Sequence, residues 1–176
     1  MTRPTADSIS VESGPKRVLV AGVGNVFLGD DGFGVEVVAQ LAGSRLPNEV
    51  EVADFGIRGF DLAYALMDGY EAVVLVDAVP KGQAPGTVYV IEPDTEQLDE
   101  LGAPDGHSLD PVSVLRLVKQ LGGRAPRCYL IGCEPASLGP EEGAMGLSPA
   151  VEGSVGEAVA VVEDLVQRLL VDGEVS

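Results

Sequence analysis

The apolar residues of this chain follow two patterns, short continuous runs and longer stretches with helical spacing. Short runs are typical of strands that are buried on both faces of a sheet. They predict strands at residues 16–21, 50–53, 72–76, 87–91 and 127–131. Apolar side chains that recur every three or four positions, together with turn residues at the ends, predict helices at residues 31–42, 60–66, 110–121 and 148–170.

The order of these elements predicts the fold class. Strands alternate with helices, which is typical of an α/β protein whose largely parallel sheet carries helices on both faces. The link between strands 72–76 and 87–91 is an exception, because it is shorter than the dozen or more residues that a helical crossover needs. We therefore expect strand 87–91 to run antiparallel to its neighbour.

Length and composition indicate one globular domain. The chain has 176 residues, of which 45% are hydrophobic, and no apolar run approaches the roughly 18 residues that a membrane span requires. Residues 1–15 are polar and lack the apolar segment of a secretory signal, so we expect a disordered extension there and a single domain over 16–172. The net charge of −17 argues against nucleic acid or an anionic membrane as a partner.

Two cysteines indicate the redox environment. Cys128 and Cys133 are five positions apart in a predicted strand, and an odd separation places their side chains on opposite faces. A disulfide or a metal shared between them is therefore unfavourable. We expect two small core residues in the reducing environment of the cytoplasm.

The most informative stretch follows the first strand. Gly22, Gly24 and Asn25 break the apolar run, as expected for a tight turn at the end of a strand. Two adjacent acids, Asp30 and Asp31, then precede the first predicted helix. Either acid could cap that helix, whose first N–H groups lack partners. Two carboxylates at the end of a central strand could also bind a cation.

A metal site is a second interpretation of the same edge. Ligands of open α/β sheets bind outside the carboxyl ends of the strands, where Asp31 and Asp77 both lie. His107, the only histidine, precedes helix 110–121. Two carboxylates and an imidazole suit zinc, nickel, iron or manganese, and the residues alone do not distinguish these metals. Alternatively, Asp31 is only a cap, Asp77 only binds loop N–H groups, and His107 is only solvated.

Several motifs carry a resemblance to a known family. Residues 22–34 read G-V-G-N-V-F-L-G-D-D-G-F-G and resemble the opening signature of the [NiFe]-hydrogenase maturation proteases. The similarity covers roughly residues 16–170. Further stretches resemble the family's segments in the same order: D-F-G-I-R-G at 54–59, V-V-L-V-D-A at 73–78, G-H-S-L-D-P at 106–111, I-G-C-E-P-A at 131–136 and M-G-L-S-P-A-V at 145–151.

The resemblance implies a fold and an activity. The fold is a three-layer α/β/α sandwich around a five-stranded, mostly parallel mixed sheet, of the phosphorylase/hydrolase-like kind. The activity is endopeptidase removal of the C-terminal extension from the hydrogenase large-subunit precursor after nickel has been loaded. The nickel is carried by the precursor, and zinc or cadmium could occupy the same site.

The resemblance also implies roles for particular residues. The family's metal-contacting positions correspond to Asp31, Asp77 and His107, with Asp30 as the substitute for Asp31. Asp31 and Asp77 are the best candidates for a catalytic role, although the motifs do not settle how the peptide bond is cut. Asp54 and Gly56 are candidates for positioning the substrate.

Two other functions fit parts of the same sequence. Residues 22–27 begin like the G-x-G-x-x-G motif of dinucleotide-binding domains, but Phe27 stands where the third glycine allows close helix packing. The two acids would also face the pyrophosphate, so this function is unfavourable. A non-catalytic nickel-sensing assembly factor or metallochaperone stays open, because sensing and cleavage would use the same ligands.

Overall fold

The structure is a computed structural model that describes residues 16–94, 111–138 and 145–172. In these ranges five strands form one sheet: β1 (Val18–Val23), β2 (Val50–Gly56), β3 (Ala72–Ala78), β4 (Val88–Ile91) and β5 (Arg127–Cys133). The helices are η1, a 3₁₀ turn (Gly29–Gly32), α1 (Phe33–Leu41), α2 (Gly59–Leu66), α3 (Pro111–Gln120), α4 (Pro149–Glu152) and α5 (Val155–Asp172). The predicted disordered extension, residues 1–15, lies outside the described residues.

The strand order places β1 and β3 side by side within the sheet. The order is β2-β1-β3-β5-β4, and every pairing is parallel except that of β4 with β5. The predicted antiparallel strand is therefore confirmed. After β1 the chain goes to β2 on one side and then to β3 on the other. The carboxyl ends of β1 and β3 thus form the switch point at which open α/β sheets bind ligands.

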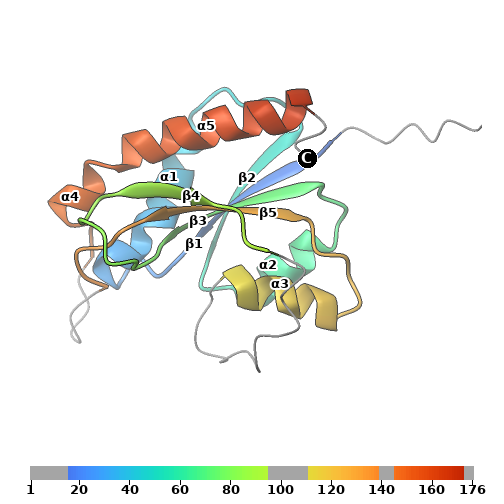
Figure 1. The fold of residues 1–176 in the computed structure, drawn as a ribbon, viewed down its shortest axis with the longest axis horizontal. Coiled ribbons are helices and arrows are strands. Elements are labelled where there is room, and N and C mark those ends of the chain that lie inside the picture. Colours follow the sequence, from blue (N-terminus) through green and yellow to red (C-terminus); the bar gives the residue numbers. More distant parts are fainter. Residues whose placement is uncertain (1–15, 95–110, 139–144, 173–176) are drawn as a thin grey trace, which may run out of the picture.

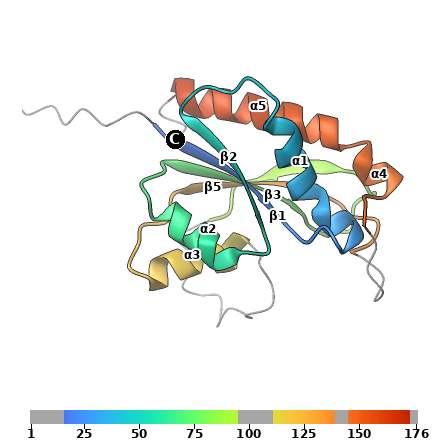
Figure 2. The ribbon, with the colours of Figure 1, turned by 180° about the vertical axis from the view of Figure 1, so that it is seen from behind.

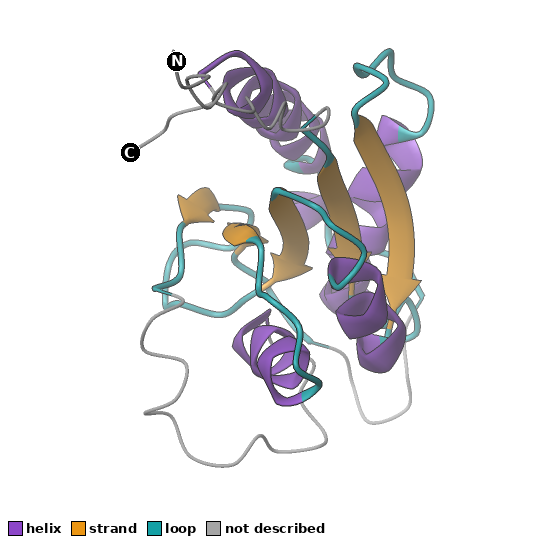
Figure 3. Cartoon of the chain, turned by 90° about the vertical axis from the view of Figure 1, so that its right-hand side faces the viewer, coloured by secondary structure: helices purple, strands orange, loops and turns teal. Residues whose placement is uncertain are grey.

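Helices cover both faces of the sheet, which confirms the predicted three-layer sandwich. Helices α1 and α5 pack on one face, and α2 and α3 pack on the other (Figures 1 and 2). Figure 3 shows the strands with helices on both sides. Every residue of β1 and β3 is buried, as continuous apolar runs predict. Cys128 and Cys133 are free, buried and in the two opposite cores, as expected.

Several element boundaries differ from the predictions, three of them in ways that bear on the site. Strand β3 continues through Asp77, because the ladder with β5 extends to the pair Ala78 and Cys133. The first helix begins at Phe33 and not at Asp31, since residues 29–32 form η1. The predicted helix 148–170 is divided into α4 and α5 at Gly153 and Ser154, where the Ser154 hydroxyl donates to the carbonyl oxygens of Ala150 and Gly86.

The start of α4 also differs. It begins at Pro149, with Ser148 before it as the N-cap residue, and the serine side chain makes no capping hydrogen bond. Its hydroxyl donates to Asp30 instead, 2.9 Å away. Within the described ranges, none of the helices combines the length and apolar character needed to cross a bilayer.

Candidate functional site at the carboxyl edge

The chain turns sharply at Gly24, immediately after β1. Gly24 has φ +132°, and its N–H donates to the carbonyl oxygen of Gly56 at 2.9 Å. A Cβ atom at this position would lie 1.8 Å from the carbonyl oxygen of Asp31. Only glycine fits this backbone and this close approach. The turn therefore brings the end of β1 against the backbone of Asp31.

The carboxylate of Asp31 closes the same turn. The side-chain oxygen of Asn25 accepts the N–H of Phe27 at 2.9 Å, and Asp31 Oδ2 accepts the N–H of Asn25 at 2.8 Å. Gly32 is the N-cap of α1, and no side chain caps it, so the proposed capping role of Asp30 or Asp31 is wrong. Asp31 is half-buried and holds its carboxylate at the end of β1.

Asp77 lies against this turn from the neighbouring strand. Its side chain is buried, and Oδ1 accepts the N–H of Ala78 at 2.8 Å. A Cβ atom at Gly24 would lie 3.6 Å from this oxygen. Gly24 thus separates the carboxylate of Asp77 from the backbone of Asp31. The structure brings these two segments together at the switch point.

Asp54 and Gly56 end the next strand, β2. Asp54 is exposed, and its backbone carbonyl accepts a hydrogen bond from the guanidinium of Arg58. Gly56 has φ +53°, and a Cβ atom there would lie 3.7 Å from Asp54 Oδ1 and 3.7 Å from the carbonyl oxygen of Gly24. Both residues therefore adjoin the Gly24 turn.

The third predicted ligand, His107, lies outside the described residues. Within the ranges that the structure describes, no three histidine, cysteine or acidic side chains are grouped so that they could hold a metal ion. Of the three predicted ligands, the structure thus describes Asp31 and Asp77. Carboxylates with one imidazole form a donor set that suits nickel or zinc.

Asp30, the predicted alternative to Asp31 as a metal ligand, faces the interior. It is 1% exposed and accepts hydrogen bonds from the N–H groups of Ala136, Ser137 and Ser148 and from the Ser148 hydroxyl. Burial alone raises the pKa of a carboxyl. Here the hydrogen bonds from Ser148, Ala136 and Ser137 together outweigh burial and lower the pKa of Asp30. The local pattern of residues carried no signal that distinguished the two adjacent acids, and only the family resemblance favoured Asp31.

Glu134 is a second buried acid that sequence reasoning missed. Its carboxylate accepts the N–H groups of Lys81 and Gly82, at 2.6 and 3.1 Å, and its backbone pairs with Gly86 and Thr87. These contacts fasten the loop between β3 and β4 to the end of β5. Glu134 therefore helps to fix the loop that follows Asp77.

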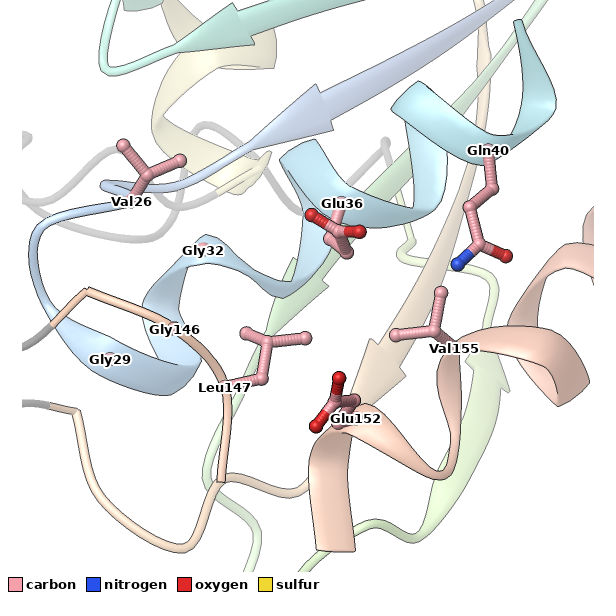
Figure 4. A pocket seen from close by; sticks show the side chains of 9 residues that line it. All are labelled: Val26, Gly29, Gly32, Glu36, Gln40, Gly146, Leu147, Glu152 and Val155. Atoms are coloured by element: carbon pink, nitrogen blue, oxygen red, sulfur yellow. The ribbon is translucent and has the colours of Figure 1, made fainter. Parts of the chain in front are cut away.

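A pocket of about 220 Å³ opens between η1, α1 and the start of α4. Glu36 and Gln40 extend into it from α1, Glu152 and Val155 border it from α4 and α5, and Leu147 lies between them (Figure 4). The pocket lies beside the turn that carries Asp30 and Asp31, since Gly29 and Gly32 of η1 also line it.

Neither thiol has the properties of a nucleophile. Burial raises the pKa of Cys133 to about 11, with a further contribution from the negative charge of Asp30. Burial, and then the charge of Glu92, raises the pKa of Cys128 to about 12. Both thiols are therefore protonated near neutral pH, and only thiolates attack efficiently.

Apolar side chains are exposed on the segments that follow β1 and β2. Phe27 follows β1, Ile57 follows β2, and Phe60 and Tyr64 lie on α2; Phe60 is 68% exposed. We call these four side chains the apolar rim. Large apolar side chains exposed on segments that leave the same edge of a sheet would suit contact with another polypeptide.

Comparisons with known proteins define the class of this chain. The family described as HycI, hydrogenase maturation protease, matches residues 35–165. A putative hydrogenase maturation protease of Methanocaldococcus jannaschii is 33% identical over 150 residues, which is 84% of this chain and 94% of the relative. The hydrogenase 2 maturation protease of Escherichia coli is 31% identical over 147 residues, 83% of this chain and 88% of the relative.

Solved structures agree with the sequence comparisons. The hydrogenase-maturating endopeptidase HybD of E. coli has a TM-score of 0.70 and 28% identity, and the match covers 86% of this chain and 93% of that one. A hydrogenase 2 maturation peptidase of the Thaumarchaeota archaeon SCGC_AB-539-E09 has a TM-score of 0.66 and 36% identity, with 86% and 99% covered. The chain belongs to the hydrogenase maturation protease family and is thus a hydrolase of peptide bonds.

Proposed function

We propose that this protein is the endopeptidase that removes the C-terminal extension of a nickel-loaded [NiFe]-hydrogenase large-subunit precursor. Membership of the family supports the reaction class. The proposal that the substrate carries nickel rests on one observation, that Asp77 and the backbone of Asp31 both lie against Gly24. It supplies two carboxylates at the point where an α/β sheet binds its ligand.

In this proposal the nickel is part of the substrate. Asp31 and Asp77 bind it through carboxylate oxygens, and His107 supplies the imidazole. Binding the metal orients the precursor, so that the bond to be cut lies beside the two carboxylates. Zinc and cadmium suit the same donor atoms and would occupy the site in place of nickel. A carboxylate oxygen of Asp31 or Asp77 that the metal leaves free would accept a proton from water.

The apolar rim supports a polypeptide substrate. Phe27, Ile57 and Phe60 flank the turns at Gly24 and Gly56, so a chain that presents nickel to Asp31 and Asp77 would also contact them. Asp54 and Gly56 then position the backbone of that chain. Two free, buried thiols support a cytoplasmic location, where such groups stay reduced.

The test is incubation with nickel-loaded and nickel-free precursor, with the products measured by mass spectrometry. We expect wild-type protein to cut only the loaded precursor, and Asp31→Asn and Asp77→Asn to bind it weakly and cut it at least about a hundredfold more slowly. Binding without cleavage by the wild type would instead indicate the non-catalytic assembly factor. Equal cleavage of both precursors would refute nickel recognition.

A further inference from the structure

One buried carboxylate joins two segments that are far apart in sequence. Asp30 lies in η1, and the residues that donate to it are 106 to 118 positions further along the chain. Oδ1 accepts the N–H of Ser148 at 2.6 Å. Oδ2 accepts the N–H groups of Ala136 and Ser137 at 2.8 and 3.2 Å, and the Ser148 hydroxyl at 2.9 Å. Both oxygens are therefore held by donors from the opposite segment.

The chemistry of these contacts requires a carboxylate. All four donors carry hydrogen toward the acid, so the group must accept at both oxygens. An asparagine of the same shape would turn its NH₂ group toward at least one of the backbone N–H groups. Two donors would then face each other, and neither the NH₂ nor that N–H would have a hydrogen-bond acceptor in this buried place. A charged acceptor also makes stronger hydrogen bonds than a neutral one. The tie between the segments thus depends on this one side chain.

The tie fixes two structures at once. On one side it holds η1, which also contains Asp31, the residue after Asp30. The backbone of Asp31 meets Gly24, and the Asp31 carboxylate holds the N–H of Asn25. On the other side it holds Ser148 at the start of α4, next to Leu147 in the pocket wall. A shift of η1 would therefore displace Asp31 from the Gly24 turn.

We propose that Asp30 is a positioning residue for the cleavage reaction. By tying η1 to the residues before α4, it sets the place of the Asp31 carboxylate opposite Asp77. This proposal rests on the proposed function for its kinetic consequence, whereas its structural part stands on the contacts alone. Asp30 does not touch the substrate; it acts through Asp31. Displacement of a reacting group by about 1 Å costs up to about a hundredfold in rate.

The variants are Asp30→Asn and the milder Ser148→Ala, which removes one donor and keeps the three N–H groups. Asp164→Asn is the matched control, because Asp164 forms an exposed ion pair with Arg168 on α5. Cleavage of nickel-loaded precursor gives kcat and KM, and hydrogen exchange gives the protection of single amides. The decisive amide is that of Asn25, whose partner is Asp31 and not Asp30.

We expect Asp30→Asn to lower kcat about ten- to a hundredfold with KM changed less than about threefold. The amides of Asn25, Ala136 and Ser148 should exchange faster, while those of β1 and β3 keep their protection. Ser148→Ala should act in the same direction with a smaller loss, which keeps the test usable if Asp30→Asn does not fold. Asp164→Asn should match the wild type.

Three results would overturn the proposal. Unchanged cleavage by Asp30→Asn with faster exchange at Ala136 and Ser148 would show a tie without a role in positioning. Unchanged exchange of the Asn25 amide would show that Asp31 does not depend on Asp30. Loss of protection throughout β1 and β3 in both variants would show a role in folding only. If the wild-type protein left the precursor intact, only the proposed function would be refuted. The exchange rate of the Asn25 amide in Asp30→Asn would still test whether Asp30 positions Asp31.

Discussion

The two edges of the sheet hold their acidic side chains in different ways. At the amino edge, Glu51 pairs with Arg17 at 3.2 Å and Glu92 pairs with Arg127 at 3.1 Å. Both arginines also lie over tyrosine rings, Arg17 over Tyr70 and Arg127 over Tyr129. At the carboxyl edge, the carboxylates of Asp30, Asp31 and Glu134 accept hydrogen bonds from backbone N–H groups.

The difference has an electrostatic consequence. An arginine neutralises the carboxylate that it pairs with, so the amino-edge pairs carry little net charge. Backbone N–H groups orient a carboxylate and satisfy its oxygens without supplying a full positive charge. The carboxylates of Asp30, Asp31 and Glu134 are held without such an offset, and they would attract a cation such as the nickel of the proposed precursor.

The largest expected effect is that of a side chain at Gly24. Gly24→Ala puts a Cβ atom 1.8 Å from the Asp31 carbonyl oxygen, so the turn must open. We expect a loss of roughly 2–4 kcal/mol in the free energy of unfolding, together with loss of cleavage. Urea denaturation measures the first. Gly69→Ala is the amino-edge control: Gly69 also has positive φ (+83°), but no atom lies within 4 Å of an added Cβ. It should cost only about 1 kcal/mol, and equal losses at the two sites would contradict the packing argument.

Replacement of the apolar rim should weaken precursor binding without destabilising the fold. Ile57 and Phe60 are exposed, so Ile57→Ser and Phe60→Ser should leave the melting temperature nearly unchanged. Each should raise KM for the loaded precursor about tenfold, which corresponds to the loss of an apolar contact worth about 1.4 kcal/mol. Val171→Ser, on an exposed position of α5, is the control. If Ile57→Ser and Phe60→Ser both kept the wild-type KM, as the control should, the apolar rim would have no part in binding.

The two thiols report on the two edges, since Cys133 lies near Asp30 and Cys128 near Glu92. Their pKa values of about 11 and about 12 are raised above the ordinary 9.0, so the fold favours the neutral thiol. That contribution to stability is fully present below pH 9 and is lost as pH rises through about 11. At pH 8 a thiolate-selective reagent should modify neither cysteine until urea unfolds the protein. Fast reaction of the native protein would show that a thiol is accessible.

The smallest effect is expected at the amino edge. Arg17→Ala removes an exposed ion pair and a contact over Tyr70 at 4.4 Å. We expect a loss of about 1 kcal/mol in the free energy of unfolding, which shrinks in high salt, and no change in cleavage. Denaturation at two salt concentrations measures this. A large fall in cleavage would mean that the two edges are coupled.

Much of the fold could be predicted because local pattern determines it. The runs at β1 and β3 are buried along their full length, and the short link to β4 correctly predicted an antiparallel strand. The close approach at Gly24 was also predictable in kind, because a glycine after a buried strand indicates a turn. Asp77 was placed at the right edge, although its strand is longer than the apolar run.

The roles of Asp30 and Glu134 could not be predicted, because partners distant in sequence decide them. Two adjacent acids look alike in a local pattern, and only contacts with Ala136 and Ser148 turn one of them inward. The carboxylate of Glu134 likewise depends on Lys81 and Gly82, more than fifty positions earlier. The convergence of His107 with Asp31 and Asp77 stays a prediction, since His107 lies outside the described residues.

The most direct test of the central claim is cleavage of loaded and nickel-free precursor by matched variants of the two edges. Asp77→Asn removes a carboxyl-edge charge, and Asp68→Asn removes an exposed charge near the amino edge. The account predicts that wild type and Asp68→Asn cut only the nickel-loaded precursor, and that Asp77→Asn keeps the melting temperature but cuts the loaded precursor at least about a hundredfold more slowly. Full cleavage of the loaded precursor by Asp77→Asn, or equal cleavage of both precursors by the wild type, would contradict it.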